Sequence, residues 1–453
     1  MQQTWLRISL LLCTFGFFRE MRPSEPFVVE YLTGPYRNLT NDELSRVVYP
    51  VGTYSYLIQL VIVFLITDIL RYKFIIVVSA LSGIILFAIL LWTYTLWELL
   101  IGQVFYGTFM ASEVAYYTYI YAKVDKSHYQ IVSGHTRSAI LCGKFLGGVL
   151  AQVLVSTDIL NYRHLHYMSF GSQIVSLVIA LALPKVNESI YFYKSNEAKE
   201  DHAASGTDPQ ALEIGNIEDN KAKDTNASDK KPKFSWRNAF RLIMQHIVSA
   251  YTNPTVVKWS IWWSLATCGQ LQVISYVQIL WKDIDGNNES SYNGAVEATV
   301  TLLGAAAAMT AGLMEGVRRQ HWHIWILTIC SILMGAFMII SAVTNLLWVA
   351  YAMYVLFGIL YFFVITIASA TVAHNLTDDS FGLIFGINTL IALVLQTILT
   401  LIVVTDAGYA LLPRDQYKVY GGYFLVLAVI FVAVYIQEHL SKYCTKSKVK
   451  SLE

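Results

Sequence analysis

Long apolar runs separated by short polar stretches recur along the whole chain. Most approach the ~20 residues with which a helix crosses a bilayer. Lipid cannot hydrogen-bond an exposed backbone, and the runs are too long and too uniform for the strands of a membrane barrel. The pattern therefore predicts an all-α membrane protein with twelve transmembrane helices. The runs cover residues 5–32, 48–70, 74–94, 97–122, 130–156, 164–183, 256–281, 291–315, 322–342, 346–370, 380–404 and 419–440.

A polar stretch divides the twelve runs into two sets of six. It is rich in Asp, Glu, Lys, Ser and Asn, and such a composition cannot bury enough apolar surface to fold alone. This layout is that of the major facilitator fold, in which two bundles rock around a central site. We expect an N-terminal six-helix bundle (1–184), a disordered cytoplasmic linker (185–255), a C-terminal six-helix bundle (256–440) and a cytoplasmic tail (441–453).

Composition narrows the class of protein further. Of the 453 residues, 55% are hydrophobic and 14% are charged, whereas soluble domains carry about 25% charged residues. The net charge of +1 gives no reason to expect nucleic acid, so lipid is the expected surrounding. The five cysteines show no CxxC spacing, which predicts no metal site, and nothing in the sequence calls for a cofactor. Neither HExxH nor GxxxxGK[ST] occurs, so we do not expect an enzyme.

Basic residues in the short loops predict the orientation, because cytoplasmic loops carry an excess of Lys and Arg. With twelve spans, one side receives Arg71, Lys73, Lys123, Lys126, Arg318, Arg319 and the lysines of the tail. Both termini and the linker are then cytoplasmic in a multi-pass protein of the plasma membrane. The sequons at Asn38 and Asn288 fall on the opposite side, where we expect glycosylation.

Charged residues within the runs are the candidate functional groups. A charge at the centre of a membrane helix costs about 2.5–3.5 kcal/mol on insertion scales, so it persists only with a partner or a purpose. The deep charges are Glu25, Glu113, Lys144 and Glu297, and Arg137 lies about one turn inside its span.

Glu113 is the strongest candidate for a substrate contact among these charges. Tyr116 and Tyr117 follow at helical i+3 and i+4 spacing and share its face. A carboxylate beside aromatic rings suits an organic cation, which gains Coulomb attraction and a cation–π contact. The alternatives are an interhelical ion pair with Lys144 or Arg137, and a protonated carboxylate that carries a coupled proton.

The other deep charges have competing interpretations too. Glu25 lies between Pro23 and Pro26, which break the helix, and a carboxylate at such a break indicates a binding site or a pair with Arg22. For Lys144, pairing with a glutamate is favoured over direct substrate contact. Glu297 begins a small-residue face that indicates helix packing, with a place in the cavity as the alternative.

At these residues the sequence resembles the folate and thiamine carriers of solute carrier family 19. The similar stretches follow in order from the first span to the eleventh: "FFREMRPSEPFVVEYLTGPYRNLT", "YPVGTYSYLIQLVIVFLITDILRYK", "EVAYYTYIYAKV", "WWSLATCGQLQVISYVQILW", "SYNGAVEATVTLLGA" and "LIFGINTLIALVLQTILTLIVV". The resemblance implies a vitamin transporter that works by alternating access.

Within the family, the resemblance favours thiamine over folate. The folate carriers have basic residues at the positions of Glu113, Gly358 and Gln396, whereas "MRPSEPF" and "SEVAYY" resemble the thiamine transporters. That resemblance implies a thiamine-like cation bound by Glu25, Tyr49, Glu113 and Tyr116. Folate or another organic-anion vitamin, with Lys144 as its anchor, is the alternative.

Other positions match or depart from the thiamine transporters' pattern. Gln278 matches it, and with Ser275 completes the expected contacts. At five positions this chain departs from that pattern. The thiamine transporters have Trp at the position of Gly52, aromatic residues at Gln270 and Leu271, an amide at Ser275 and Tyr at Lys144. They leave room for a related vitamin, a phosphorylated thiamine or a different organic cation.

Overall fold

The protein folds almost entirely into helices in a computed structural model, which describes residues 2–70, 72–123, 129–184, 236–286, 291–313, 320–376 and 381–450. The helices of the N-terminal half are α1 (Gln2–Glu20), η1 (Glu25–Phe27), α2 (Val28–Thr33), α3 (Asn41–Glu43), η2 (Leu44–Val48), α4 (Tyr49–Leu70), α5 (Tyr72–Trp92), α6 (Leu96–Ala111), α7 (Glu113–Lys123), α8 (Tyr129–Ser156) and α9 (Tyr162–Ala182). Those of the C-terminal half are α10 (Trp236–Thr252), α11 (Pro254–Asp285), α12 (Asn293–Leu313), α13 (Gln320–Val343), α14 (Leu347–His374), α15 (Phe381–Val403) and α16 (Pro413–Lys450).

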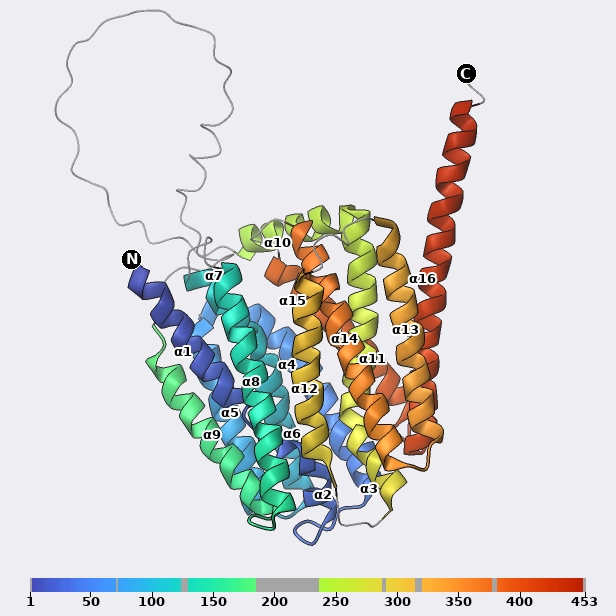
Figure 1. The fold of residues 1–453 in the computed structure, drawn as a ribbon. Helices are drawn as coiled ribbons and strands as arrows, with labels where there is room; N and C mark the ends of the chain where they lie inside the picture. The colour runs from blue at the N-terminus through green and yellow to red at the C-terminus, as the bar shows by residue number, and fades with distance from the viewer. Residues whose placement is uncertain are drawn as a thin grey trace, which may run out of the picture.

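The long helices form two bundles that meet along a central interface (Figure 1). In the N-terminal bundle α1 packs on α8 and α9, and α4 and α5 pack on α6. In the C-terminal bundle α13 packs on α16 and α14, and α11 packs on α14, α15 and α16. The bundles touch through the pairs α8–α12 and α4–α15. Both α1 and α16 have their outer ends on one face of the molecule, and α2 and α3 lie at the opposite end (Figure 1).

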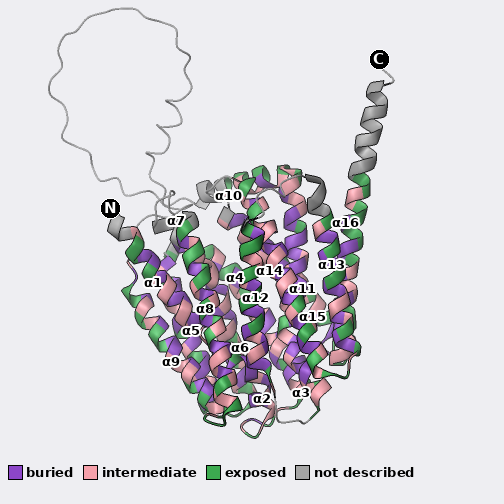
Figure 2. Ribbon diagram, viewed as in Figure 1, coloured by how far each residue is buried: buried purple, intermediate pink, exposed green. Residues whose placement is uncertain are grey.

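This fold is that of the major facilitator transporters, as the pattern of apolar runs predicted. Nine helices of the described residues are long and apolar enough to cross a membrane. Exposed residues recur along the outer helices (Figure 2), and many of them are large and apolar, which suits contact with lipid. Among them are Ile58, Leu65, Val178, Leu302 and Val429.

Local sequence signals set several helix ends. Thr95 begins α6 with a capping box, in which its hydroxyl accepts from the Glu98 N–H while the Glu98 carboxylate accepts from the Thr95 N–H. Asn253 caps α11, which has Pro254 at its first position, where a missing N–H costs nothing.

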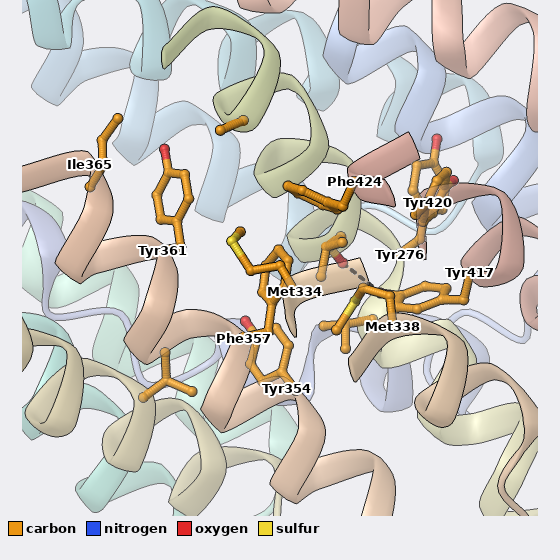
Figure 3. Packing of buried hydrophobic residues seen from close by; sticks show 14 of the residues in the cluster. Tyr276, Met334, Met338, Tyr354, Phe357, Tyr361, Ile365, Tyr417, Tyr420 and Phe424 are labelled. Carbon is orange, nitrogen blue, oxygen red and sulfur yellow. Dashed lines mark hydrogen bonds between the residues drawn. The ribbon is translucent and has the colours of Figure 1, made fainter. Parts of the chain in front are cut away.

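Buried aromatic rings and two methionines fill the interior of the C-terminal bundle (Figure 3). Met334 and Met338 lie fully buried among them, and Phe357 packs edge-on against Phe424 with ring centroids 5.4 Å apart. The hydroxyl of the buried Tyr417 donates to the Val273 carbonyl at 2.7 Å. A filled interior makes this bundle a rigid wall for the cavity that it borders.

The structure corrects four of the predicted boundaries. The run 5–32 is interrupted after Glu20, and α1 gives way to a turn, η1 and α2. The run 97–122 is broken at Ser112 into α6 and α7. Residues 236–252, expected within the disordered linker, form α10, an amphipathic helix that packs on α11 and α15. The helix α16 continues through the expected tail to Lys450, and residues 185–235 lie outside the described part of the chain.

Candidate functional site

A cavity of about 310 Å³ lies between the two bundles. Residues from α4, α5, α6, α8 and α9 form one side, and residues from α11, α12, α14 and α15 form the other. The turn after α1 adds further groups. Of the predicted site residues, the lining includes Glu25, Tyr49, Lys144, Ser275, Gln278 and Glu297.

The break after α1 carries a buried ion network. Glu20 is only 4% exposed, and its carboxylate meets three cations: Arg19 at 2.5 Å, Arg22 at 2.8 Å and Lys144 at 3.3 Å. A lone carboxylate at this depth would be strongly disfavoured, so these partners are what keep it ionised. Lys144 therefore pairs with a glutamate, as favoured from the sequence, but the glutamate is Glu20 rather than Glu113.

Glu25 projects from the turn into the cavity. Its side chain is 47% exposed, and one oxygen lies 3.1 Å from an Arg22 nitrogen, so the predicted pair with Arg22 is present and the carboxylate also lines the cavity. The Gln278 amide donates to the Glu25 backbone carbonyl at 2.9 Å, which ties α11 of the C-terminal bundle to the turn. The proline-broken backbone thus obtains a partner from the opposite bundle.

Glu113, Tyr116 and Tyr117 lie apart from the cavity lining. Glu113 begins α7, where it is 31% exposed and 3.9 Å from Arg19, a partner that the sequence argument did not consider. Tyr116 is buried, and its hydroxyl donates to the Leu12 carbonyl of α1 at 2.8 Å. Tyr117 packs against the Tyr116 ring with centroids 5.4 Å apart.

Of the two remaining deep charges, Glu297 lines the cavity and Arg137 is exposed. Glu297 lines the cavity from α12 and accepts a hydrogen bond from the Tyr354 hydroxyl at 3.0 Å. Among the described residues its carboxylate has no ion-pair partner. Arg137 is exposed on α8 and does not line the cavity.

Neutral polar and aromatic side chains complete the wall. Tyr49 meets Tyr276 edge-on with ring centroids 5.8 Å apart, and the Ser275 hydroxyl donates to the Leu271 carbonyl of its own helix at 2.8 Å. A Cβ added to Gly52 would lie 2.5 Å from the Gln103 side-chain oxygen, so Gln103 fills the space beside the missing side chain.

Several lining residues escaped the sequence argument. They include Glu20, Tyr56, Gln103, Tyr106, His166 and Gln396. Glu20 had a usable signal, since it is a charge within the predicted run 5–32. Neutral residues such as Tyr56 and Tyr106 had none, because tyrosines are frequent throughout this chain.

One end of the interface is closed by hydrogen bonds between the bundles. Gln152 of α8 accepts from the Ala295 N–H of α12 at 3.0 Å, and Asn293 donates to the Glu30 carboxylate of α2 at 2.8 Å. This is the end that holds α2 and α3 (Figure 1). Of the predicted glycosylation sites, Asn38 is exposed at this end and Asn288 lies outside the described residues.

A model of the reduced folate carrier family matches residues 3–419 of the chain. The chain belongs to the reduced folate carrier family. Thiamine transporter 1 of Mus musculus is 38% identical to this family member over 99% of the chain and 93% of the mouse protein. Thiamine transporter 2 of Homo sapiens is 37% identical over 99% of this chain and 93% of the human protein. The human reduced folate transporter is 31% identical over 95% of the chain and 72% of that protein.

Solved structures of lower sequence identity share the fold of this reduced folate carrier family member. The nucleoside transporter NupG aligns with a TM-score of 0.58 at 12% identity, covering 94% of this chain and 98% of NupG. The POT family transporter PepTSo aligns with a TM-score of 0.63 at 11% identity, covering 96% of this chain and 98% of PepTSo.

Proposed function

We propose that this chain carries thiamine, or a closely related organic-cation vitamin, across the membrane by alternating access. The charge of the cavity lining is the observation that carries this proposal. Three carboxylates (Glu20, Glu25, Glu297) face two basic groups (Arg22, Lys144), which leaves one net negative charge. A cation neutralises that charge, whereas an anion would add to it.

Glu297 is the carboxylate that we assign to the cation. Glu20 and Glu25 already have basic partners, but Glu297 has only the Tyr354 hydroxyl among the described residues. The sequence favoured Glu113 for this role, but Glu113 lies outside the lining and beside Arg19. Glu113 then holds Arg19, while Tyr49, Ser275, Gln278 and Glu25 surround the substrate.

The anionic alternative, folate, fits this cavity less well. Gln396 lines the wall as a neutral amide and position 358 is a glycine, so neither position supplies a base. A Cβ added to Gly358 would lie 2.7 Å from a Val300 methyl. The volume of about 310 Å³ lies at the lower end of the ~300–1,000 Å³ typical of ligand pockets, which suits a small vitamin.

The membrane setting of the proposal follows the loop charges. Both termini face the cytoplasm, the end with α2 and α3 faces outward, and the chain resides in the plasma membrane. Thiamine transporters are its relatives, and the exposed Asn38 sequon suits an outward face. A proton that binds Glu297 at acidic pH would compete with the cation, and this is the route that we propose for proton coupling.

Uptake by cells that express the chain tests the proposal. Labelled thiamine and labelled folate are compared at acidic and neutral pH, with Glu297→Gln and Glu113→Gln beside the unchanged protein. We expect saturable thiamine uptake that Glu297→Gln abolishes and Glu113→Gln weakens. Folate uptake without thiamine uptake would refute the cation assignment, and a loss confined to Glu113→Gln would return the substrate contact to Glu113.

A further inference from the structure

The amphipathic helix α10 lies across the face of the molecule on which α1 and α16 have their outer ends (Figure 1). Only Asn253 separates it from α11, and it packs on α11 and α15. The 32 residues of α11 span about 48 Å, close to the ~40–45 Å of a bilayer with its headgroups. A helix joined to the end of α11 therefore lies at the level of the lipid headgroups.

One side of α10 is fixed to the C-terminal bundle. Ala250 is 4% exposed, and the Tyr251 hydroxyl donates to the Asn388 side-chain oxygen of α15 at 3.1 Å. Asn388 is fully buried and donates in turn to the Ser260 hydroxyl of α11 at 3.2 Å. These contacts set the rotation of α10 about its own axis, and with it the directions of the other side chains.

A second row of side chains on α10 is apolar and exposed. Phe240, Met244 and Val248 follow one another at i, i+4 spacing and are 64%, 42% and 59% exposed. At about 100° per residue, this row lies between the buried Ala250 and the exposed polar Gln245 around the helix. Because the bundle lies beneath α10, the row points sideways, along the plane of the membrane.

The helix α10 is basic as well as apolar. It contains Arg237, Arg241 and His246 and no acidic residue. Arg241 is exposed, and at about 100° per residue it borders the apolar row beside Val248. Among the described residues no carboxylate pairs with Arg241. An arginine at the edge of an apolar row can lay its stem along lipid and keep its guanidinium among the headgroups.

The two helices on which α10 packs carry exposed apolar side chains of their own. Ile261 of α11 is 47% exposed and Ile391 of α15 is 42% exposed. Side chains of this kind on a membrane bundle face lipid, because lipid accepts apolar surface that water does not. The exposed row of α10 thus continues the lipid-facing surface of the bundle up to its end.

We propose that α10 is an interfacial helix that binds anionic phospholipids. Phe240, Met244 and Val248 lie at the boundary between headgroups and acyl chains, and Arg241 binds a headgroup phosphate. An apolar row in the membrane plane with basic residues beside it is the arrangement of interfacial helices. Basic residues at this level gain further from the negative surface potential of anionic lipid. The inference goes beyond the transported substrate and does not depend on it.

Fluorescence quenching of the full chain in vesicles tests the position of the row. Met244→Cys and Gln245→Cys are matched neighbours on the apolar and the polar side of α10. Each is labelled with an NBD fluorophore in a variant whose five native cysteines are replaced by alanine. The vesicles contain phosphatidylcholine with a nitroxide on the acyl chain near the headgroup. We expect the label at 244 to be quenched roughly twofold or more as strongly as the label at 245.

Thermal unfolding of the purified full chain in detergent tests the headgroup contact and keeps the native cysteines. Because a bound ligand stabilises the folded form, we expect phosphatidylglycerol to raise the midpoint further than phosphatidylcholine does. Arg241→Gln should remove about half of this difference or more, whereas Arg241→Lys should keep most of it. Lys418→Gln is the matched control for a lost charge and should leave the difference unchanged. Lys418 pairs with Asp415 at the start of α16, at the opposite end of the molecule (Figure 1).

Several outcomes would overturn the inference. Equal quenching at the two labelled positions is one, and a label at 244 that stays in water would assign the row to a soluble protein partner instead. An equal rise of the midpoint with both lipids, or a difference that Arg241→Gln leaves unchanged, would refute the headgroup contact. A difference lost equally in Arg241→Gln and Lys418→Gln would report net charge alone and would refute it too. Neither measurement involves thiamine, so a failure of the proposed function leaves both tests intact.

Discussion

Replacing Glu20 with Gln should be among the most destabilising single changes near the cavity. Glu20 is 4% exposed and is shared by Arg19, Arg22 and Lys144 at 2.5 to 3.3 Å. Glutamine keeps the shape but removes the charge. Arg19, Arg22 and Lys144 are then balanced only by Glu25 and Glu113, which leaves one surplus positive charge. Removing one partner of a buried ion pair costs roughly 3–5 kcal/mol, which is a large part of the 5–15 kcal/mol that stabilises a typical fold.

Glu25→Gln is the matched comparison, because the substitution is the same and the residue is close by. Glu25 is 47% exposed and has one ion-pair partner, Arg22 at 3.1 Å, so the expected loss is about 0–1 kcal/mol. A double variant, Glu20→Gln with Lys144→Gln, removes the surplus charge and should recover part of the stability. Contacting residues couple by ~0.5–3 kcal/mol, so the two single losses should not add.

Thermal unfolding of the purified full chain in detergent, followed by tryptophan fluorescence, measures the ranking. We expect the apparent midpoint to fall most in Glu20→Gln, less in the double variant and least in Glu25→Gln. Equal midpoints for the two single variants would refute the reasoning, because the burial and the three partners of Glu20 would then contribute nothing.

Three further changes test other parts of the structure. A Cβ at Gly148 would lie 2.8 Å from the Gly294 carbonyl, so Gly148→Val should cost about 1–3 kcal/mol and slow uptake, and an unchanged uptake rate would contradict the closed end. Tyr116→Phe should cost ~0.5–1.5 kcal/mol through its lost bond to Leu12 without changing half-saturation for thiamine, whereas a raised half-saturation would place Tyr116 in the site. Asn38→Gln should remove a glycosidase-sensitive mobility shift on gels, and a shift that persists unchanged would show that Asn38 carries no glycan.

Membrane helices and several cavity charges were predictable because lipid imposes one strong rule on each. Apolar length identifies the spans, and the cost of a deep charge singled out Glu25, Lys144 and Glu297, which do line the cavity. The same rule applies to Glu20, which lies within the predicted run 5–32, but the adjacent Arg19 makes it resemble the end of a helix. Its burial depends on how α1 packs on α8 and α9, which a single sequence does not encode locally.

Glu113 illustrates the second limit. Its spacing to Tyr116 and Tyr117 correctly indicates a shared helix, but spacing does not fix the direction in which a helix face points. The break at Ser112, invisible within a continuous apolar run, starts a new helix at Glu113. Tyr116 then points to α1 rather than toward the cavity. The amphipathic α10 was missed because its neighbours in the polar stretch dominate the composition.

The single net negative charge of the cavity lining has an electrical consequence. When a monovalent cation binds, the centre of the carrier becomes neutral, so the membrane voltage exerts little force on the loaded form as the bundles rock. The empty form keeps its charge unless Glu297 binds a proton, and each elementary charge that crosses the full field is worth ~2.3 kcal/mol per 100 mV. An interior-negative voltage would therefore accelerate the return of the empty carrier to the outside, and voltage would act on the turnover rate rather than on substrate affinity.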